Sequence, residues 1–228
     1  MRTHLRLLTA VAVVFLLSQA VPLASGQDTQ AEEIDSKVQA FLDSHQYQWR
    51  YENVAEEDGK VLFDLIVENE YTRALDIGTS TGHSAIWIAW ALSKTGGRLI
   101  TVEIDEYRHQ KALENFEKAG LSEFIDARLA DAHELVLQLE GPFDFVFIDA
   151  DKNWYTNYAK AILPKLETGG CLAARNVWNL FYMRGIREFL DYVRSVPELE
   201  TGINEESRSG ISLSYKREPI KKGSWPKD

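Results

Sequence analysis

Two acidic residues follow apolar runs in this chain, and a turn with two glycines lies directly after the first. Asp76, Gly78 and Gly82 lie in LDIGTSTGHSA (75–85), and Glu103 closes the apolar part of LITVEID (99–105). Glycine adopts backbone angles that other residues avoid and lets a ligand approach the main chain. Parallel strands end at one edge of a sheet, where ligands of α/β proteins bind. The pattern therefore predicts a ligand site that contains both carboxylates.

Neither common phosphate-binding pattern fits this turn. A dinucleotide fingerprint reads G-x-G-x-x-G, but Ser80 stands where the second glycine is needed. A P-loop continues with Lys and Ser or Thr after its last glycine, whereas His83 follows Gly82. The turn favours a ligand with a ribose and a positive charge but no phosphate, and a βα turn without any ligand remains the alternative.

Alternating helices and strands are expected to hold these residues in place. After a helix at 31–45 and one around 61–66, strands are expected before Gly78 and at 98–103, 125–129, 143–148 and 169–174. Helices are expected at 84–93, 107–119, 132–139, 152–163 and 184–195. Such alternation predicts a doubly wound, mostly parallel α/β sheet. The last runs, 198–203 and 210–216, are joined by a link too short for a parallel crossover, so they should form an antiparallel pair.

The amino terminus has the three parts of a secretory signal. Basic residues precede an apolar run from Leu7 to Leu17, and small residues end at Gly26. The run is shorter than the ~20 residues that span a bilayer, which favours cleavage and export over a permanent anchor. We expect a signal peptide at 1–26, a helical lead-in at 27–53, one α/β domain at 54–216 and a flexible tail at 217–228. An N-terminal membrane anchor is the alternative.

Net charge and cysteine content limit the classes of binding partner that we expect. The chain has 25 basic and 35 acidic residues, and its net charge of −10 argues against nucleic-acid binding. The single cysteine, Cys171, excludes an intramolecular disulfide. The expected partner is a small-molecule substrate, with no stable membrane insertion after processing, and a homodimer is an open alternative.

With LDIGTSTGHSA, TVEID, LADAHEL and FDFVFIDADKNWY in this order, the chain resembles class I S-adenosylmethionine-dependent O-methyltransferases. It is most similar to the branch with catechol and caffeoyl-CoA O-methyltransferases, and the likeness runs from about Val54 to Tyr215. The resemblance implies a seven-stranded sheet with an antiparallel seventh strand. It also implies a cofactor site whose residues are Asp76, Gly78, Ser80, Gly82, Ser84, Glu103, Asp131, Ala132 and Asp149.

The resemblance also suggests roles within that site. Asp76 and Gly78 would line the methionine part of S-adenosylmethionine, and Ser84 would bind its carboxylate at a helix start. Glu103 would accept hydrogen bonds from both ribose hydroxyls. Asp131 and Ala132 would border the adenine, although an N-cap role for Asp131 has an equal claim.

The catalytic motif of the resembled enzymes departs from their pattern in this chain. In FIDADK (147–152), Asp149 matches a metal ligand and Lys152 the general base, but the later Asp-Asn ligand pair reads Arg175 and Asn176. A guanidinium repels a divalent cation, so metal binding through Asp149 and Asn176 is doubtful. Arg175 is instead expected to pair with Asp149 or to face an anionic substrate oxygen; a displaced surface Arg175 and a solvated Lys152 are the alternatives.

Together with this departure, the resemblance implies an O-methyltransferase that uses Lys152, Arg175 and Asp149 to methylate a small hydroxylated, aromatic molecule without a metal. An exported S-adenosylmethionine-binding protein that has lost or altered catalysis is the alternative. A nicotinamide-dependent oxidoreductase is disfavoured by Ser80. Aromatic residues after both motifs would wall the substrate pocket or pack in the core: Trp154, Tyr155, Tyr158, Trp178, Phe181 and Tyr182.

Overall fold

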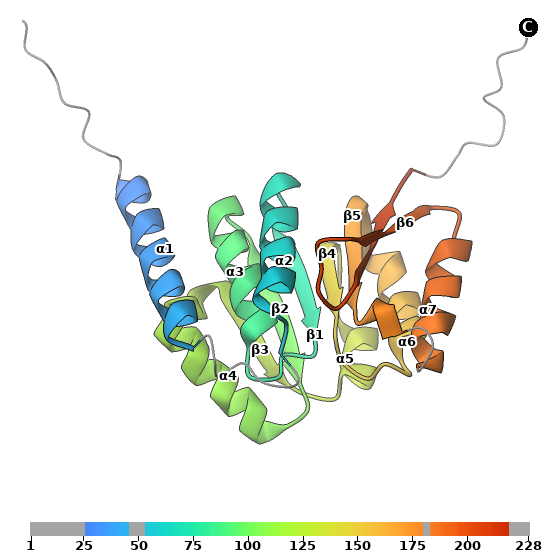
Figure 1. The fold of residues 1–228 in the computed structure, drawn as a ribbon, viewed down its shortest axis with the longest axis horizontal. Helices are drawn as coiled ribbons and strands as arrows, with labels where there is room; N and C mark the ends of the chain where they lie inside the picture. Colours follow the sequence, from blue (N-terminus) through green and yellow to red (C-terminus); the bar gives the residue numbers. More distant parts are fainter. Residues whose placement is uncertain (1–25, 46–52, 180–182, 219–228) are drawn as a thin grey trace, which may run out of the picture.

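The computed structural model of the chain describes residues 26–45, 53–179 and 183–218 (Figure 1). Its centre is one seven-stranded sheet with the strand order β3-β2-β1-β4-β5-β7-β6. The strands are β1 (Arg73–Ile77), β2 (Arg98–Glu103), β3 (Ile125–Leu129), β4 (Phe143–Ile148), β5 (Leu166–Arg175), β6 (Leu199–Asn204) and β7 (Ile211–Lys216). The helices are α1 (Gly26–His45), α2 (Glu56–Glu68), α3 (His83–Thr95), α4 (Glu106–Ala119), α5 (Ala132–Gln138), α6 (Tyr155–Ile162) and α7 (Arg184–Ser195).

The strand directions confirm the expected doubly wound, mostly parallel sheet. Strands β3, β2, β1, β4 and β5 pair in parallel, whereas β7 runs antiparallel to both β5 and β6. The chain order reverses between β1 and β4, which are neighbours in the sheet. In an open sheet this is where a crevice forms at the carboxyl ends of the strands.

Alternating side chains of the buried strands build two hydrophobic layers. In β4, Phe145 and Phe147 belong to the core on one face, and Val146 and Ile148 belong to the core on the other. Helices α1 to α4 cover the first face, and α5 to α7 cover the second (Figure 1). Because both faces are covered, the strands read as nearly continuous apolar runs, and the polar residues at their ends stand out.

The glycine turn after β1 brings two strand ends into close contact. Gly78 has φ +111°, and a Cβ there would lie 2.6 Å from the backbone oxygen of Asp149. Gly82 has φ +100°, and a Cβ there would lie 2.6 Å from the Phe116 ring of α4. The first glycine therefore lets β1 approach β4 at the site, and the second lets α3 pack on α4.

Several element boundaries differ from the sequence prediction, and two of them lie close to the site or to its central strands. Helix α6 begins at Tyr155 instead of 152, because Asp151 forms a turn that accepts hydrogen bonds from the backbone N–H groups of Asn153 and Trp154. Strand β5 begins at Leu166 instead of 169, with an irregular register against β4 at Phe143 and Phe145. Gly169 and Gly170, where the strand was expected to begin, lie within this irregular strand.

Several predictions fall outside the described residues. They concern the signal peptide up to residue 25, the residues 46–52 of the lead-in, the tail from 219 onward, and Phe181 and Tyr182. Within the ranges that the structure describes, no helix combines the length and apolarity that a membrane span requires.

Candidate active site

A cavity of about 470 Å³ opens at the carboxyl ends of β1, β2, β4 and β5. Most of the predicted site residues lie in its wall: Gly78, Ser80, Glu103, Asp131, Ala132, Asp149, Lys152, Arg175 and Asn176. Three predicted cofactor residues, Asp76, Gly82 and Ser84, are buried and do not line it. The fold thus brings residues from separate motifs to one crevice, as their positions at strand ends predict.

Glu103 is held rigidly at the end of β2. Its Oε2 accepts a hydrogen bond of 2.7 Å from the backbone N–H of Ser80, and its Oε1 accepts bonds of 3.0 Å from those of Ile104 and Asp105. The residue is only 7% exposed and lines the cavity. A fixed carboxylate with further acceptor capacity suits a diol such as a ribose, so the residues present fit the predicted cofactor.

Asp76 lies behind the glycine turn in a fully buried position. Its Oδ2 accepts hydrogen bonds of 3.0 Å from the hydroxyls of Ser84 and Thr101, and its Oδ1 has no partner among the described residues. Burial raises the pKa of Asp76 to about 7, against the effect of both hydrogen bonds. The Ser84 hydroxyl is turned toward Asp76 in this structure, so its contact with a cofactor carboxylate stays a prediction.

Asp131 is the N-cap of helix α5, which was the alternative to its predicted role beside the adenine. Its Oδ1 accepts a hydrogen bond of 2.8 Å from the backbone N–H of His133, and the residue also lines the cavity. His133 itself is a cavity residue that sequence analysis did not select, and its ring lies 4.1 Å from that of Trp154. Its place two residues after the cap is the only sequence signal for it.

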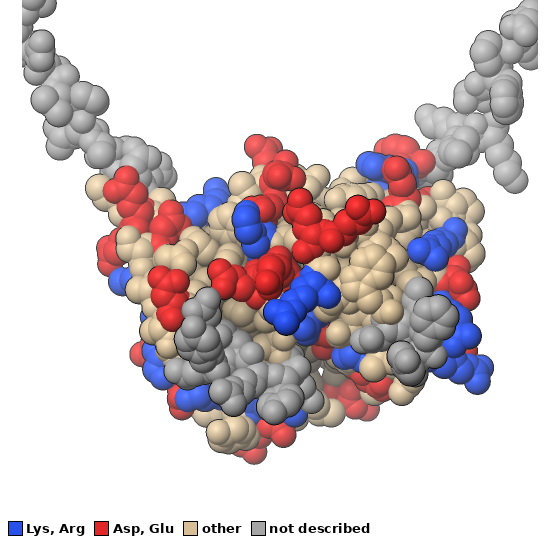
Figure 2. Space-filling model, in the orientation of Figure 1, with Lys and Arg blue, Asp and Glu red and all other residues tan. Residues whose placement is uncertain are grey.

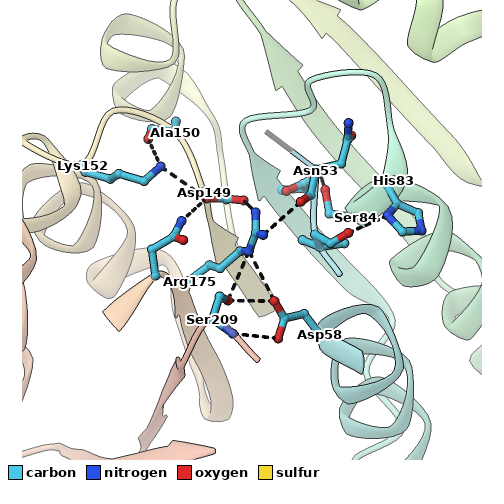
Figure 3. A network of polar contacts seen from close by, with 12 residues as sticks. Asn53, Asp58, His83, Ser84, Asp149, Ala150, Lys152, Arg175 and Ser209 are labelled. Atoms are coloured by element: carbon cyan, nitrogen blue, oxygen red, sulfur yellow. Dashed lines mark hydrogen bonds and ion pairs between the residues drawn. The ribbon is translucent and has the colours of Figure 1, made fainter. Parts of the chain in front are cut away.

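Asp149 is the centre of a network of positive and polar groups (Figure 3). Arg175 Nη1 donates to Asp149 Oδ2 at 2.8 Å, and Asn176 Nδ2 donates to Asp149 Oδ1 at 3.1 Å. Lys152 Nζ forms an ion pair with the same Oδ1 at 3.5 Å. Burial raises the pKa of Asp149, and the charges of Arg175 and Lys152 oppose that rise.

The rest of the Arg175 guanidinium is also engaged. Nη2 donates to the backbone oxygen of Asn53 at 2.9 Å, and Nε donates to Ser209 Oγ at 3.2 Å. Nε further lies 3.4 Å from Asp58 Oδ2. The side chain is 11% exposed, so the structure confirms the predicted pairing with Asp149 and excludes a displaced surface arginine. Asn53, Asp58 and Ser209 lacked any motif that could have revealed them.

These residues do not fit a divalent cation. Magnesium and calcium require oxygen ligands, mostly carboxylates, but both oxygens of Asp149 already accept hydrogen bonds from nitrogen donors. Within the described part of the chain no group of three His, Cys, Asp or Glu side chains has the arrangement of a metal site. The permanent charge of Arg175 adds repulsion at the position where a ligand would be needed.

His83 has a structural place beside the site. Its Nδ1 lies 2.8 Å from the backbone oxygen of Val54, and its Nε2 accepts from Trp87 Nε1 at 3.1 Å. This pairing assigns the proton to Nδ1, and burial lowers the pKa of His83 to about 4. The imidazole is therefore neutral and ties the start of α3 to the segment before α2.

The aromatic residues after the motifs divide between core and site. Tyr155 and Tyr158 are buried in the core on the α6 face, and Tyr158 also reaches the cavity wall. Trp154 is partly buried beside His133, whereas Trp178 is 49% exposed. Tyr155 therefore packs in the core, Tyr158 belongs to both the core and the cavity wall, and a place in a substrate pocket stays a prediction for Trp154 and Trp178.

Comparisons with known proteins agree with this architecture. Residues 28–214 match the model of an O-methyltransferase family. The chain is 39% identical to a catechol O-methyltransferase of Niastella koreensis over 129 residues, which cover 55% of this chain and 58% of that relative. It is 30% identical to a caffeoyl-CoA O-methyltransferase of Eucalyptus globulus over 176 residues, 72% of this chain and 71% of the relative.

A solved structure extends the similarity to the whole fold. The O-methyltransferase of Bacillus cereus, in complex with SAH, superimposes with a TM-score of 0.66 at 26% identity and covers 87% of this chain and 94% of its own. The family match, the relatives and the sheet topology lead to one assignment. This chain belongs to the O-methyltransferase family, among the class I S-adenosylmethionine-dependent enzymes.

Proposed function

We propose that this protein transfers a methyl group from S-adenosylmethionine to a hydroxyl oxygen of a small aromatic molecule, and that it does so without a divalent metal. The observation that carries the proposal is the 2.8 Å contact between Arg175 Nη1 and Asp149 Oδ2 in the wall of the cavity. It puts a permanent positive charge beside the position of the catalytic motif. The names of the catechol and caffeoyl-CoA relatives support an aromatic hydroxyl as the acceptor.

S-adenosylmethionine supplies an electrophilic methyl group when it is bound. Lys152 is the group placed to take the proton of the acceptor hydroxyl. The acceptor oxygen would then bond to the methyl carbon as the bond from that carbon to sulfur breaks. Lys152 Nζ lies in the same cavity wall as Arg175 and next to Asp149. Arg175 stabilises the negative charge on the acceptor oxygen through its guanidinium, the task that a metal ion performs elsewhere.

The surface charge supports a small acceptor over a nucleic acid. Figure 2 shows acidic side chains gathered across the middle of one face, over α2. The acidic residues Asp43, Glu56 and Glu57 line a second cavity of about 660 Å³, and Arg175 belongs to the wall of both cavities. A phosphate backbone would be repelled by this face.

We further propose that residues 1–26 direct export and are removed. The support is the basic, apolar and small-residue order of that segment. Mass spectrometry of the native protein should find an amino terminus near Gln27. An intact Met1 in a cytosolic fraction would overturn export, and an intact amino terminus in a membrane fraction would indicate the anchored alternative.

The test of the catalytic proposal uses residues 27–228 with labelled S-adenosylmethionine and a panel of catechols, phenols and hydroxylated acids, with and without EDTA. Methyl transfer should be unchanged by the chelator. Arg175→Asp should lower the metal-free rate and create a dependence on magnesium, whereas the exposed Arg187→Asp on α7 should behave like the unaltered protein.

Two results would contradict this proposal. If EDTA abolishes transfer by the unaltered protein and magnesium restores it, another carboxylate must complete a metal site. If the protein binds S-adenosylmethionine but methylates no acceptor of the panel, the alternative of a binding protein without this catalysis replaces it.

A further inference from the structure

Asp58 is a fully buried acid in the first turn of α2, and its partners lie far away in the sequence. Its Oδ1 accepts hydrogen bonds of 2.6 Å from Ser207 Oγ and 2.8 Å from the backbone N–H of Arg208. Its Oδ2 accepts a bond of 2.7 Å from Ser209 Oγ. All three residues belong to the loop between β6 and β7, so one carboxylate fastens that loop to α2.

The same carboxylate reaches the guanidinium of Arg175 in two ways. Arg175 Nε donates to Ser209 Oγ at 3.2 Å, and the Ser209 hydroxyl donates in turn to Asp58 Oδ2. Arg175 Nε also lies 3.4 Å from Asp58 Oδ2 directly. A guanidinium can only donate and an ionised carboxylate can only accept. The direction of both hydrogen bonds, from Arg175 to Ser209 and from Ser209 to Asp58, is therefore fixed (Figure 3).

Asp58 retains its negative charge although it is buried. Burial acts to raise the pKa of Asp58, but the hydrogen bonds from Ser207 and Ser209 and the charge of Arg175 outweigh it and leave the pKa lowered. Arg175 is thus held between two carboxylates, Asp58 at its Nε side and Asp149 at Nη1. Because the guanidinium is planar and rigid, an anchor at Nε determines where the Nη groups point.

We propose that Asp58 is a positioning residue: through Ser209 and Arg175 Nε, it fixes the orientation in which the guanidinium faces Asp149 and the acceptor oxygen. This inference rests on the proposed role of Arg175 as the stabilising cation. Asp58 does not line the cofactor cavity, although it and Ser209 belong to the wall of the second cavity. Its hydrogen bonds and ion pair connect it to the cofactor cavity through Arg175. Its loss should therefore lower turnover and leave cofactor binding unchanged.

The test compares Asp58→Asn and Ser209→Ala with Glu68→Gln, an exposed change on the same helix. Asp58→Asn puts an amide N–H where an acceptor is needed, so kcat with catechol should fall at least tenfold, while KM for S-adenosylmethionine changes less than twofold. Ser209→Ala should lower kcat several-fold and serves as the test if Asp58→Asn does not fold. The loss of kcat in these variants should be smaller at high pH and with 4-nitrocatechol, whose hydroxyl ionises more readily. A phenolate that is already formed depends less on stabilisation by Arg175.

A double-mutant cycle separates positioning from a general structural role. In an Arg175→Gln background, Asp58→Asn should lower kcat by less than a further twofold, because the residue on which it acts is gone. Equal losses in both backgrounds, or no loss in the single variant, would overturn the inference. If Arg175→Gln itself keeps full activity, the proposed role of Arg175 fails, and that outcome is distinct from the loss of positioning alone.

A readout without turnover completes the test for any acceptor. In protein labelled with ¹⁵N-arginine, the Arg175 Nε–H should give one slowly exchanging NMR signal. Asp58→Asn and Ser209→Ala should accelerate the exchange of this signal at least tenfold, and Glu68→Gln should not. Unchanged exchange in both Asp58→Asn and Ser209→Ala would show that the Nε side is held by other groups and would overturn the inference.

Discussion

The backbone N–H of Ser80 donates a hydrogen bond of 2.7 Å to Glu103 Oε2, so the acid at the end of β2 fixes the turn at the end of β1. Ser80 has φ +48°, which is an uncommon conformation for a residue other than glycine. The contact joins two motifs that are 23 residues apart and shapes the wall of the cofactor cavity.

Replacement of Glu103 should weaken cofactor binding. Glu103→Ala is expected to remove about 1–3 kcal/mol of binding free energy for S-adenosylmethionine, measured by calorimetry. Glu103→Gln should be nearly as damaging, because both Glu103 oxygens accept backbone N–H groups and an amide nitrogen cannot. The exposed Glu117→Ala on α4 is the control. An unchanged affinity in Glu103→Ala would remove this residue from the cofactor site.

Replacement of Lys152 should affect chemistry more than binding. Lys152→Met is expected to lower kcat by about 10² to 10⁴, the usual effect of losing a general base, with little change in cofactor affinity. Steady-state kinetics and calorimetry measure the two effects, and Lys118→Met at an exposed position of α4 is the control. A variant with full kcat would mean that the acceptor proton leaves by another route.

Gly78→Ala should impair both stability and cofactor binding. The new Cβ would lie 2.6 Å from the Asp149 backbone oxygen at φ +111°, so β1 and β4 must separate. Gly169→Ala is a matched control, because that glycine has φ +87° but no atom within 4 Å of the added Cβ. Both changes introduce strain of about 1 kcal/mol or more, but only Gly78→Ala should weaken binding. Equal behaviour of the two variants would contradict the crowding argument.

The buried carboxyl of Asp76 should make stability depend on pH. Its pKa in the folded protein is about 7, above the ordinary value of 3.8. At pH values between the two, the folded protein therefore binds the proton of Asp76 more tightly than the unfolded protein does. Stability from this group is present at low pH and is lost as the pH rises from about 4 through 7.

Asp76→Asn should remove the decrease in stability that accompanies ionisation of Asp76 at higher pH. Relative to the unaltered protein, its free energy of unfolding should be higher at pH 8 than at pH 5 by up to about 3 kcal/mol, measured by urea denaturation. The exposed Asp126→Asn should show no such difference. A variant whose relative stability is the same at both pH values would show that Asp76 is ionised throughout.

Much of the sheet could be predicted because its strands carry a strong local signal. The strands at 98–103, 125–129 and 143–148 have the predicted bounds, since each is an apolar or alternating run between turn residues. The antiparallel β6 and β7 followed from the short link alone. Strand β5 was predicted too short, because its irregular pairing depends on β4 and not on its own residues.

Site residues that belong to a motif at the end of a strand could be predicted. Site residues that are placed only by contacts between distant segments could not. Glu103 and Asp149 line the cavity as strand ends should. The pairing of Arg175 with Asp149 was anticipated from its position beside Asn176. Asp58 and Ser209 could not be found, because a buried acid in a first helical turn reads as an ordinary surface residue that favours a helix start.

The bonds from Asp58 to the β6–β7 loop span about 150 positions of the chain. During synthesis, the glycine turn, Glu103 and Arg175 all leave the ribosome before Ser209 and before β7, the strand that pairs with β5. Contacts between such distant segments form late in folding. A growing chain can therefore assemble its first parallel strands while the guanidinium still lacks its anchor, and full methyl-transfer activity should be reached only when the carboxyl-terminal hairpin has docked.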